Sequence, residues 1–223
     1  VVRWSSEPDG NLLGIGPSVS NPLTGEIISA DVVNKLLAIK LGYNYRKLYG
    51  YTEDNDPLMQ YITNLTLHEV GHVLGLRHNF RGSYLYSPDE IHDKNITGNV
   101  LMSSVMDYDP INIAPEGVEQ GIYFSTEPGV YDKWAVKFGY TPNLTEEERT
   151  ALLQQSVKRE LTFGTDDDAM SYPGNNIDPR TKRYDMSNDP IGYAEDIVKI
   201  VDQKINELPE IFSDEEGFNN YTN

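Results

Sequence analysis

The stretch HEVGHVLGLRHN, residues 68–79, decides how the rest of the sequence is interpreted. It follows the pattern HExxHxxGxxH, in which His68 and His72 stand four residues apart. On a helix this spacing places both imidazoles on one face, about one turn apart. Gly75 can adopt a backbone conformation that residues with side chains avoid, so it can end the helix and turn the chain back. His78 then returns from beyond the helix and completes a set of three histidines.

Three histidine nitrogens with one exchangeable position form the ligand set of a catalytic zinc site. Glu69, next to the first histidine, can hold and deprotonate a water molecule in the open position. A bare pair of helix histidines is weak evidence, but three of the four histidines in the chain fall within this longer pattern. We therefore predict that His68, His72 and His78 bind Zn²⁺ and that Glu69 is the catalytic base.

The predicted zinc ligands belong to a buried helix. Asp56 and Pro57 are typical of a helix start, with Asp56 as the N-cap and proline at the first helical position. Apolar residues then recur at helical spacing, and from Leu65 to Leu76 they surround the helix axis. Histidines on such a helix need partners in the protein interior, and a zinc ion supplies them.

A second motif, SSVMDY at residues 103–108, follows downstream. With the histidine pattern it resembles the Met-turn of the metzincin metallopeptidases. The segments HEVGHVLGLRHNF, SVMDY and NPLTGEI resemble more closely the bacterial secreted zinc-dependent metalloproteinases of the Met-zincin type, whose large precursors carry further domains. The resemblance covers about residues 1–140 well and the tail more loosely.

The resemblance implies an α+β fold, with a small twisted sheet over the zinc-site helix and a mostly helical, loop-rich C-terminal part. The catalytic domain would span residues 1–140, divided into an upper part (1–78) and a lower part (79–140) with the Met-turn. Residues 141–223 would form a helical extension of the same domain. The edge strand that binds substrate would be Gly16–Ser20 or Glu26–Asp31, and a purely structural hairpin is the alternative.

The resemblance also assigns individual roles. Met106 would pack beneath the three imidazoles as an apolar floor, and Gly75 would shape the turn before His78. Tyr108 would steady the oxyanion, or it would be a structural tyrosine. Many metzincins have aspartate after the third ligand, whereas this chain has Asn79.

The implied function is zinc-dependent hydrolysis of peptide bonds in polypeptides, by a secreted or periplasmic protein of which this chain is a fragment. One alternative is a zinc-containing module that binds polypeptide or glycan without cleaving it. Another is a structural domain in which zinc acts as a staple, although no fourth protein ligand with suitable spacing is evident. Retention of Glu69 favours the enzyme, because a purely structural site needs no base.

Composition limits the classes of molecule that the chain is expected to bind. The chain has 223 residues and a formal net charge of −17, which argues against nucleic acid and against an anionic membrane surface and favours basic substrates. It has no cysteine, so nitrogen and oxygen atoms must hold the metal. No apolar run reaches the length of a transmembrane helix.

Periodicity and capping signals predict the remaining elements: strands at Val1–Trp4 and Glu26–Val33, and helices near Asn34–Leu41, over Lys133–Gly139, from Thr145 to about Glu160, and over Ile191–Leu208. The tyrosine-rich segment Gly42–Thr52 is either a carbohydrate platform or, as we favour, a set of packed tyrosines with hydrated hydroxyls.

An acidic loop suggests a second metal site, for Ca²⁺. Gly164–Asp168 holds three consecutive aspartates, and Asp178, Asp185 and Asp189 follow. Loops rich in oxygen ligands can bind Ca²⁺, but the spacing fits no EF-hand, and solvated acidic residues are the favoured interpretation. His92, outside the zinc pattern, is expected at the surface.

Overall fold

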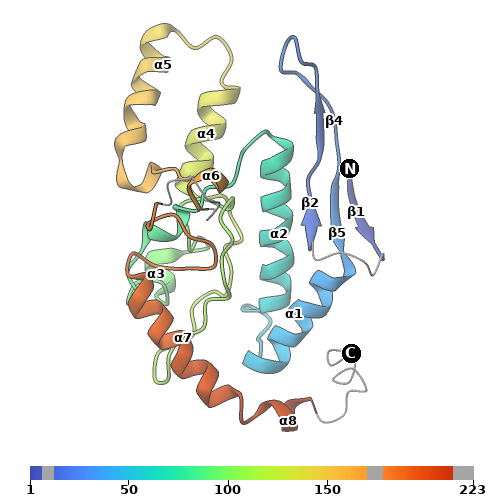
Figure 1. Cartoon of the computed structure of the whole chain (residues 1–223), viewed down its shortest axis with the longest axis vertical. Coiled ribbons are helices and arrows are strands. Elements are labelled where there is room, and N and C mark those ends of the chain that lie inside the picture. Colours follow the sequence, from blue (N-terminus) through green and yellow to red (C-terminus); the bar gives the residue numbers. More distant parts are fainter. Residues whose placement is uncertain (7–12, 170–177, 213–223) are drawn as a thin grey trace.

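A computed structural model describes residues 1–6, 13–169 and 178–212. The architecture is α+β: small sheets lie on one side of the long helix α2, and loops and further helices lie on the other (Figure 1). The α-helices are α1 (Leu36–Tyr49), α2 (Pro57–Val73), α3 (Lys94–Thr97), α4 (Val130–Tyr140), α5 (Glu146–Leu153), α6 (Asp166–Ala169), α7 (Pro190–Lys204) and α8 (Leu208–Ile211). Short 3-10 helices are η1 (Gly82–Leu85), η2 (Gln154–Val157) and η3 (Arg159–Leu161).

Three strands form the sheet that packs against α2. They lie in the order β1 (Val2–Ser5), β5 (Val32–Lys35) and β2 (Gly14–Ile15), with β1 parallel and β2 antiparallel to β5. A separate antiparallel hairpin joins β3 (Ser18–Ser20) to β4 (Ile27–Ala30). β2 is therefore an edge strand, and its free side faces the part of the chain that follows α2.

The strand predicted over Glu26–Val33 is in fact two strands in different sheets. The chain leaves the β3–β4 hairpin at Asp31, whose backbone N–H donates to the Pro17 carbonyl at 3.1 Å. The Asp31 carboxylate accepts a hydrogen bond from the Arg3 guanidinium at 3.2 Å, which ties this break to β1. The prediction of a strand at the start of the chain is confirmed.

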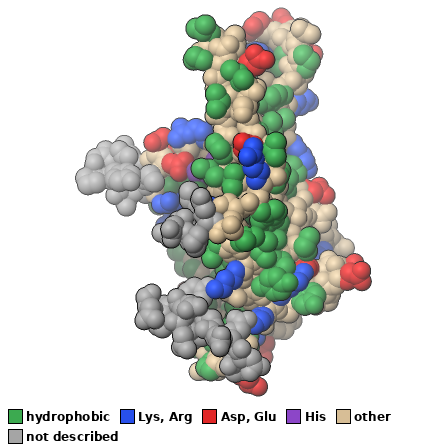
Figure 2. All heavy atoms as spheres, turned by 90° about the vertical axis from the view of Figure 1, so that its right-hand side faces the viewer, with side chains coloured by type: hydrophobic (Ala, Val, Ile, Leu, Met, Phe, Trp, Pro, Cys, Tyr) green, Lys and Arg blue, Asp and Glu red, His purple; other side chains and the backbone are tan. Residues whose placement is uncertain are grey.

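The sheet has one covered and one open face. On β5 buried and half-buried residues alternate, as expected for a strand with one covered face. The buried Asn34 donates to the Thr66 hydroxyl of α2 at 3.0 Å. Its partner across the sheet, Trp4, is exposed because β1 is an edge strand. Figure 2 shows the side of the molecule that carries the sheets, where apolar side chains lie among basic and acidic ones. Residues of β2 also line the site described below.

Helix α1 is longer than predicted, because it extends through most of the tyrosine-rich segment. Tyr45 packs edge-on against Tyr61 of α2, with ring centroids 5.7 Å apart, and also contacts Phe124. Gly42 allows this contact between helices, since a Cβ there would lie 2.4 Å from Leu58 Cδ1. Packed tyrosines are thus the correct interpretation for the inward side of α1.

Helix α2 begins and ends as the sequence indicates. The Asp56 carboxylate accepts a hydrogen bond from the Leu58 N–H at 3.0 Å and also pairs with Arg46 of α1. The helix ends after Val73, and Gly75 adopts a φ of +85°, in the left-handed region that glycine tolerates. The turn sends residues 76–80 back along the helix.

The helices after the Met-turn form near the predicted places, but their ends differ: α4 begins at Val130, three residues before the predicted Lys133. Thr145 and Glu148 form the predicted capping box, yet α5 stops at Leu153 and gives way to η2 and η3. The prediction that α4 stops at Gly139 is wrong: the helix continues to Tyr140, whose hydroxyl donates to the Leu74 carbonyl at 2.8 Å. Helix α7 ends at Lys204, before the predicted Leu208.

The chain after α5 folds back onto the loops that follow α2. The Phe80 N–H donates to the Gly164 carbonyl at 2.7 Å, and the Tyr184 N–H donates to the Tyr108 carbonyl at 3.0 Å. Residues far apart in sequence therefore line one region, whereas the predicted domain boundary at residue 140 stays a prediction. No helix within the described ranges combines the length and apolarity that crossing a membrane requires.

Candidate metal centre

The three histidines of the sequence pattern lie together. One potential ligand atom from each of His68, His72 and His78 falls within 4.8 Å of the other two. The Nε2 atoms of His72 and His78 are 3.2 Å apart. Among the described residues, this is the only group of three or more histidine, cysteine or acidic side chains that can hold a metal ion.

Hydrogen bonds fix the orientation of the two helix imidazoles. His68 Nδ1 lies 2.7 Å from the Val105 carbonyl oxygen, and His72 Nδ1 lies 3.0 Å from the Leu76 carbonyl oxygen. Because a carbonyl oxygen only accepts, each Nδ1 carries the proton and each Nε2 keeps its lone pair. Burial lowers the pKa of His68 to about 3 and lowers that of His72, so both imidazoles are neutral, as metal ligands must be.

The third imidazole is held by a carboxylate that the sequence analysis did not select. His78 Nδ1 lies 2.9 and 3.0 Å from the two oxygens of Asp166, at the start of α6. Burial acts to raise the pKa of Asp166, but the hydrogen bond from His78 and the nearby positive charge together outweigh it, so the pKa is lowered. A carboxylate of this kind fixes the ring of a metal-binding histidine and increases its basicity.

Asn79 brings Asp166 to the site. Its side-chain N–H donates to the Thr162 carbonyl at 3.1 Å, and its side-chain oxygen accepts from the Gly164 N–H at 3.1 Å. The amide thus anchors the segment that leads into α6. The charged contact that the asparagine itself cannot supply comes from Asp166 instead.

Glu69 lies in the same cavity as the histidines and is only 5% exposed. Burial raises the pKa of its carboxyl group to about 7. Strand β2 lies directly against it: a Cβ on Gly14 would be 2.6 Å from Glu69 Oε1, and one on Gly16 would be 2.3 Å from its carbonyl oxygen. Of the two edge strands considered, only the start of Gly16–Ser20 lines this cavity, together with Leu13–Ile15.

Met106 is completely buried below the zinc-site helix. A Cβ on Gly71 would lie 2.1 Å from Met106 Sδ, so glycine at the middle of the motif permits the close approach. The turn that carries Met106 is held by Asp132, which accepts hydrogen bonds from the Ser104 hydroxyl at 2.6 Å and the Val105 N–H at 2.8 Å. The sequence analysis missed the roles of Gly71 and Asp132. A glycine inside a buried helix does, however, indicate a packing requirement.

Tyr108 lies beside the histidines. Its ring centroid is 4.7 Å from that of His78 and 5.5 Å from that of His68. Burial raises the pKa of its hydroxyl group, so the hydroxyl stays protonated and can donate. Tyr184 stacks on the outer face of Tyr108 at 5.7 Å and has a φ of +63°, a strained conformation for a bulky residue.

These residues enclose a cavity of about 590 Å³, open to solvent. Residues 13–17 of the sheet region form one wall, and α2 and the segment after Met106 form the others. The lining residues are Leu13, Gly14, Ile15, Gly16, Pro17, Tyr61, Asn64, Leu65, His68, Glu69, His72, His78, Asp107, Tyr108, Asp109 and Tyr184. The cavity is large enough for side chains of an extended polypeptide next to the histidines.

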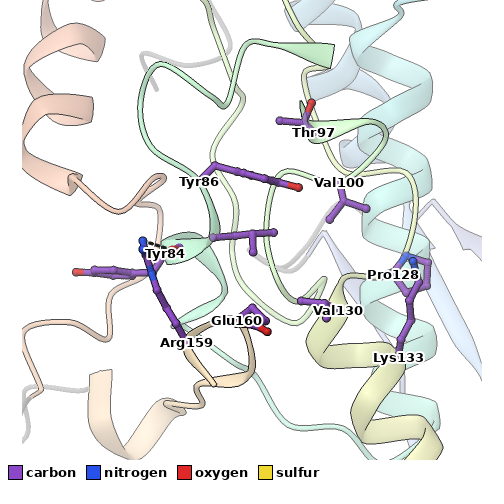
Figure 3. Close-up of a pocket in the computed structure, with 10 residues that line it drawn as sticks. Tyr84, Tyr86, Thr97, Val100, Pro128, Val130, Lys133, Arg159 and Glu160 are labelled. Carbon is purple, nitrogen blue, oxygen red and sulfur yellow. Dashed lines mark hydrogen bonds between the residues drawn. The ribbon is translucent and has the colours of Figure 1, made fainter. Parts of the chain in front are cut away.

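A second hollow, of about 630 Å³, lies away from the histidines between η1, α4 and η3 (Figure 3). Its lining is largely aromatic and aliphatic, with Tyr86 and Val100 facing it, and Arg159 donates to the Tyr84 carbonyl at 3.1 Å. It contains no histidine and no pair of acidic residues. This hollow therefore lacks the groups for metal-assisted chemistry. His92, predicted at the surface, is half-buried and apart from the centre.

The calcium hypothesis receives no support. Asp166 binds His78, Asp167 pairs with Arg77, Asp168 accepts from the Thr165 N–H, Asp178 pairs with Arg180, and Asp189 caps α7. These five side chains have separate structural partners. The sixth, Asp185, is buried without a hydrogen-bond partner for its carboxylate oxygens, but it belongs to no group of three potential metal ligands among the described residues.

A protein-family model described as Met-zincin matches residues 51–223, a range that contains the histidines, Glu69, Met106 and Asp166. No curated protein and no solved structure gives a significant match.

Proposed function

The chain belongs to the Met-zincin family, and on this basis we propose that it is a zinc-dependent endopeptidase. In this proposal His68, His72 and His78 hold Zn²⁺ in a metzincin-like arrangement, and Glu69 is the general base. The observation that carries it is the convergence of three imidazole Nε2 atoms beside a buried carboxyl group in one open cavity. A structural zinc site would be closed by a fourth protein ligand.

The donor set fits zinc. Two nitrogens at 2.0–2.1 Å from a tetrahedral ion are about 3.3 Å apart. The 3.2 Å between His72 Nε2 and His78 Nε2 matches this separation. Since the Nδ1 atoms carry the protons, the Nε2 lone pairs face one another, and a cation between them removes their repulsion.

In the proposed reaction, Glu69 and Tyr108 have separate roles. A bound zinc ion would supply Lewis acidity to a water molecule and to the scissile carbonyl. Glu69 accepts the proton of the attacking water and passes it to the leaving amine, for which a pKa near 7 is well matched. Tyr108, protonated and beside His78, donates a hydrogen bond to the developing oxyanion.

An extended polypeptide is the substrate that this cavity suits. The edge strand β2 runs along the cavity, and Gly14 and Gly16 keep its wall free of side chains next to Glu69. Substrate backbone can add to such an edge as a further strand. The proposal also places the protein outside the bacterial cytoplasm, as a secreted or periplasmic enzyme.

The decisive experiment compares the wild type with Glu69→Gln after zinc loading. We expect one zinc per chain in both proteins, casein hydrolysis by the wild type, and a loss of at least about 100-fold in the variant, because a general base contributes 10²–10⁴. Glu53→Gln, at an exposed position before the start of α2, is the matched control and should cleave normally.

Two results would reject the proposal. A folded, metal-supplemented wild type without zinc would remove the metal centre. A wild type with one zinc that binds polypeptide or glycan without cleaving it would establish the alternative, a non-catalytic binding module.

A further inference from the structure

One carboxyl group in the cavity has no part in the chemistry described above. Asp109 lies three residues after Met106 and lines the same cavity as His68 and Glu69. Asn64 of α2 donates to Asp109 Oδ2 at 3.2 Å and to the Ser125 carbonyl at 3.2 Å. Protein atoms surround the Asp109 carboxyl group, yet the residue keeps solvent-exposed surface. We call the part of the cavity next to this residue the recess, with Asp109 as its floor.

The recess opens close to the reacting centre. Asn64 precedes His68 by one helical turn on α2, and residues so spaced have Cβ atoms about 5–6 Å apart. The carboxyl group bound to Asn64 therefore lies about one helical turn from the first histidine. A lysine or arginine side chain of a substrate residue beside the scissile bond spans such a distance.

The walls suit the stem of a long cationic side chain. Leu65, Tyr61 and Tyr184 line the same cavity as Asp109, and Tyr61 lies near enough to Asp109 to feel its charge. Aliphatic and aromatic surface accommodates the methylene groups of lysine or arginine, and aromatic faces attract their charged heads. The carboxylate at the floor supplies the opposite charge, and arginine can bind it through two hydrogen bonds.

The charge of Asp109 is not compensated within the described part of the chain. No lysine or arginine there forms an ion pair with it, and its side-chain hydrogen-bond partner is the neutral Asn64. The phenols of Tyr45, Tyr61 and Tyr193 lie near enough to feel its charge, and they are neutral groups. Burial raises the pKa of Asp109 to about 7, so the carboxyl group is ionised mainly above that pH, and an incoming cation stabilises its ionised form.

From this geometry we propose that Asp109 makes the cavity selective for polypeptides with lysine or arginine at a position flanking the scissile bond. This inference rests on the proposed peptidase function. The formal net charge of −17 favours the approach of the same class of substrate. A glutamate at that position would face the carboxylate and be excluded.

The test uses the zinc-loaded protein and peptides that differ only at one of the two flanking positions, which carries Lys, Arg, Met, Gln or Glu. At one of these positions we expect kcat/KM for Lys and Arg to exceed that for Met and Gln about tenfold or more, with Glu the poorest. In Asp109→Asn the ratio of kcat/KM for the Lys peptide to that for the Met peptide should fall towards one. Asp89→Asn, an exposed carboxylate of another surface, should keep the wild-type ratio.

The outcomes separate this inference from the proposed function. Cleavage by the wild type without preference for Lys or Arg overturns the inference and leaves the peptidase intact. If no peptide is cleaved, the peptidase proposal fails, and the affinities of the same peptides for the zinc-loaded protein decide the role of the recess: equal Lys and Glu affinities overturn it. If Asp109→Asn does not fold, the test uses the wild type alone. The ratio of kcat/KM for the Lys peptide to that for the Met peptide must then increase from pH 6 to pH 8.

Discussion

Replacement of Asp166 by asparagine tests the outer support of the metal centre. Both Asp166 oxygens lie within 3.0 Å of His78 Nδ1. Asparagine keeps the shape and one accepting oxygen but removes the negative charge. The histidine then loses the partner that fixes its ring and increases its basicity, so we expect weaker zinc binding with the three ligands unchanged.

The size of the effect follows from the surroundings of the pair. Loss of such a carboxylate typically costs 10–100-fold in metal affinity, or about 1.4–2.8 kcal/mol. The side chains of His78 and Asp166 are 17% and 32% exposed, so water weakens their interaction. We therefore expect the lower end of the range, about a tenfold increase in the zinc dissociation constant.

The measurement is a zinc titration against a competing chromophoric chelator at fixed pH and ionic strength. Asp167→Asn is a matched control on the next residue, because Asp167 is 77% exposed and pairs with the exposed Arg77. Its dissociation constant should stay within about twofold of the wild type. Equal affinities for the Asp166 and Asp167 variants, both folded with one zinc, would refute the role assigned to Asp166.

Two further predictions concern stability and are measured by urea denaturation in excess zinc. Gly71→Ala places a Cβ 2.1 Å from Met106 Sδ in a fully buried position and should lower the free energy of unfolding by about 1–3 kcal/mol. The control Gly139→Ala, on helix α4 with nothing within 4 Å of the new Cβ, should raise the free energy of unfolding by about 0.5–1 kcal/mol. Equal losses of stability in the two variants would contradict the packing argument. Burial raises the pKa of Asp109 to about 7, so protonated Asp109 favours the folded state below about pH 4 and this contribution is lost as pH rises through 7. Wild type should lose about 2 kcal/mol more than Asp109→Asn between pH 5 and pH 8, after allowance for partial exposure, and parallel pH profiles would contradict the buried state of the carboxyl group.

The helix that carries the candidate site was predictable because its signals are local. The Asp56 cap, the four-residue spacing of His68 and His72, and Gly75 lie within one segment, where helical geometry alone relates them. The neighbouring helix α1 was underestimated for an equally local reason. Gly42 and several tyrosines reduce helix propensity, and only the contact with Leu58 of α2 explains the glycine.

Asp166 could not be found from spacing. It follows His78 by 88 residues, and no periodicity relates the two positions. Its place in a run of three aspartates instead suggested a solvated loop or a calcium site, because consecutive acidic residues are common at surfaces. Only the fold shows that one carboxylate of the run turns inward while Asp167 stays exposed.

Because the chain returns from Gly164 to the loop after His78, the centre can be completed only late in synthesis. On the ribosome, residues 68–78 emerge long before Asp166 is made, so a nascent chain carries all three histidines without the carboxylate that orients the third. If the centre binds zinc as proposed, such a chain would hold the ion less firmly than the completed protein, and its cleft would lack Tyr184. Synthesis itself therefore delays full assembly of the centre, and a cut in the segment between His78 and Asp166 would divide the finished centre between two pieces.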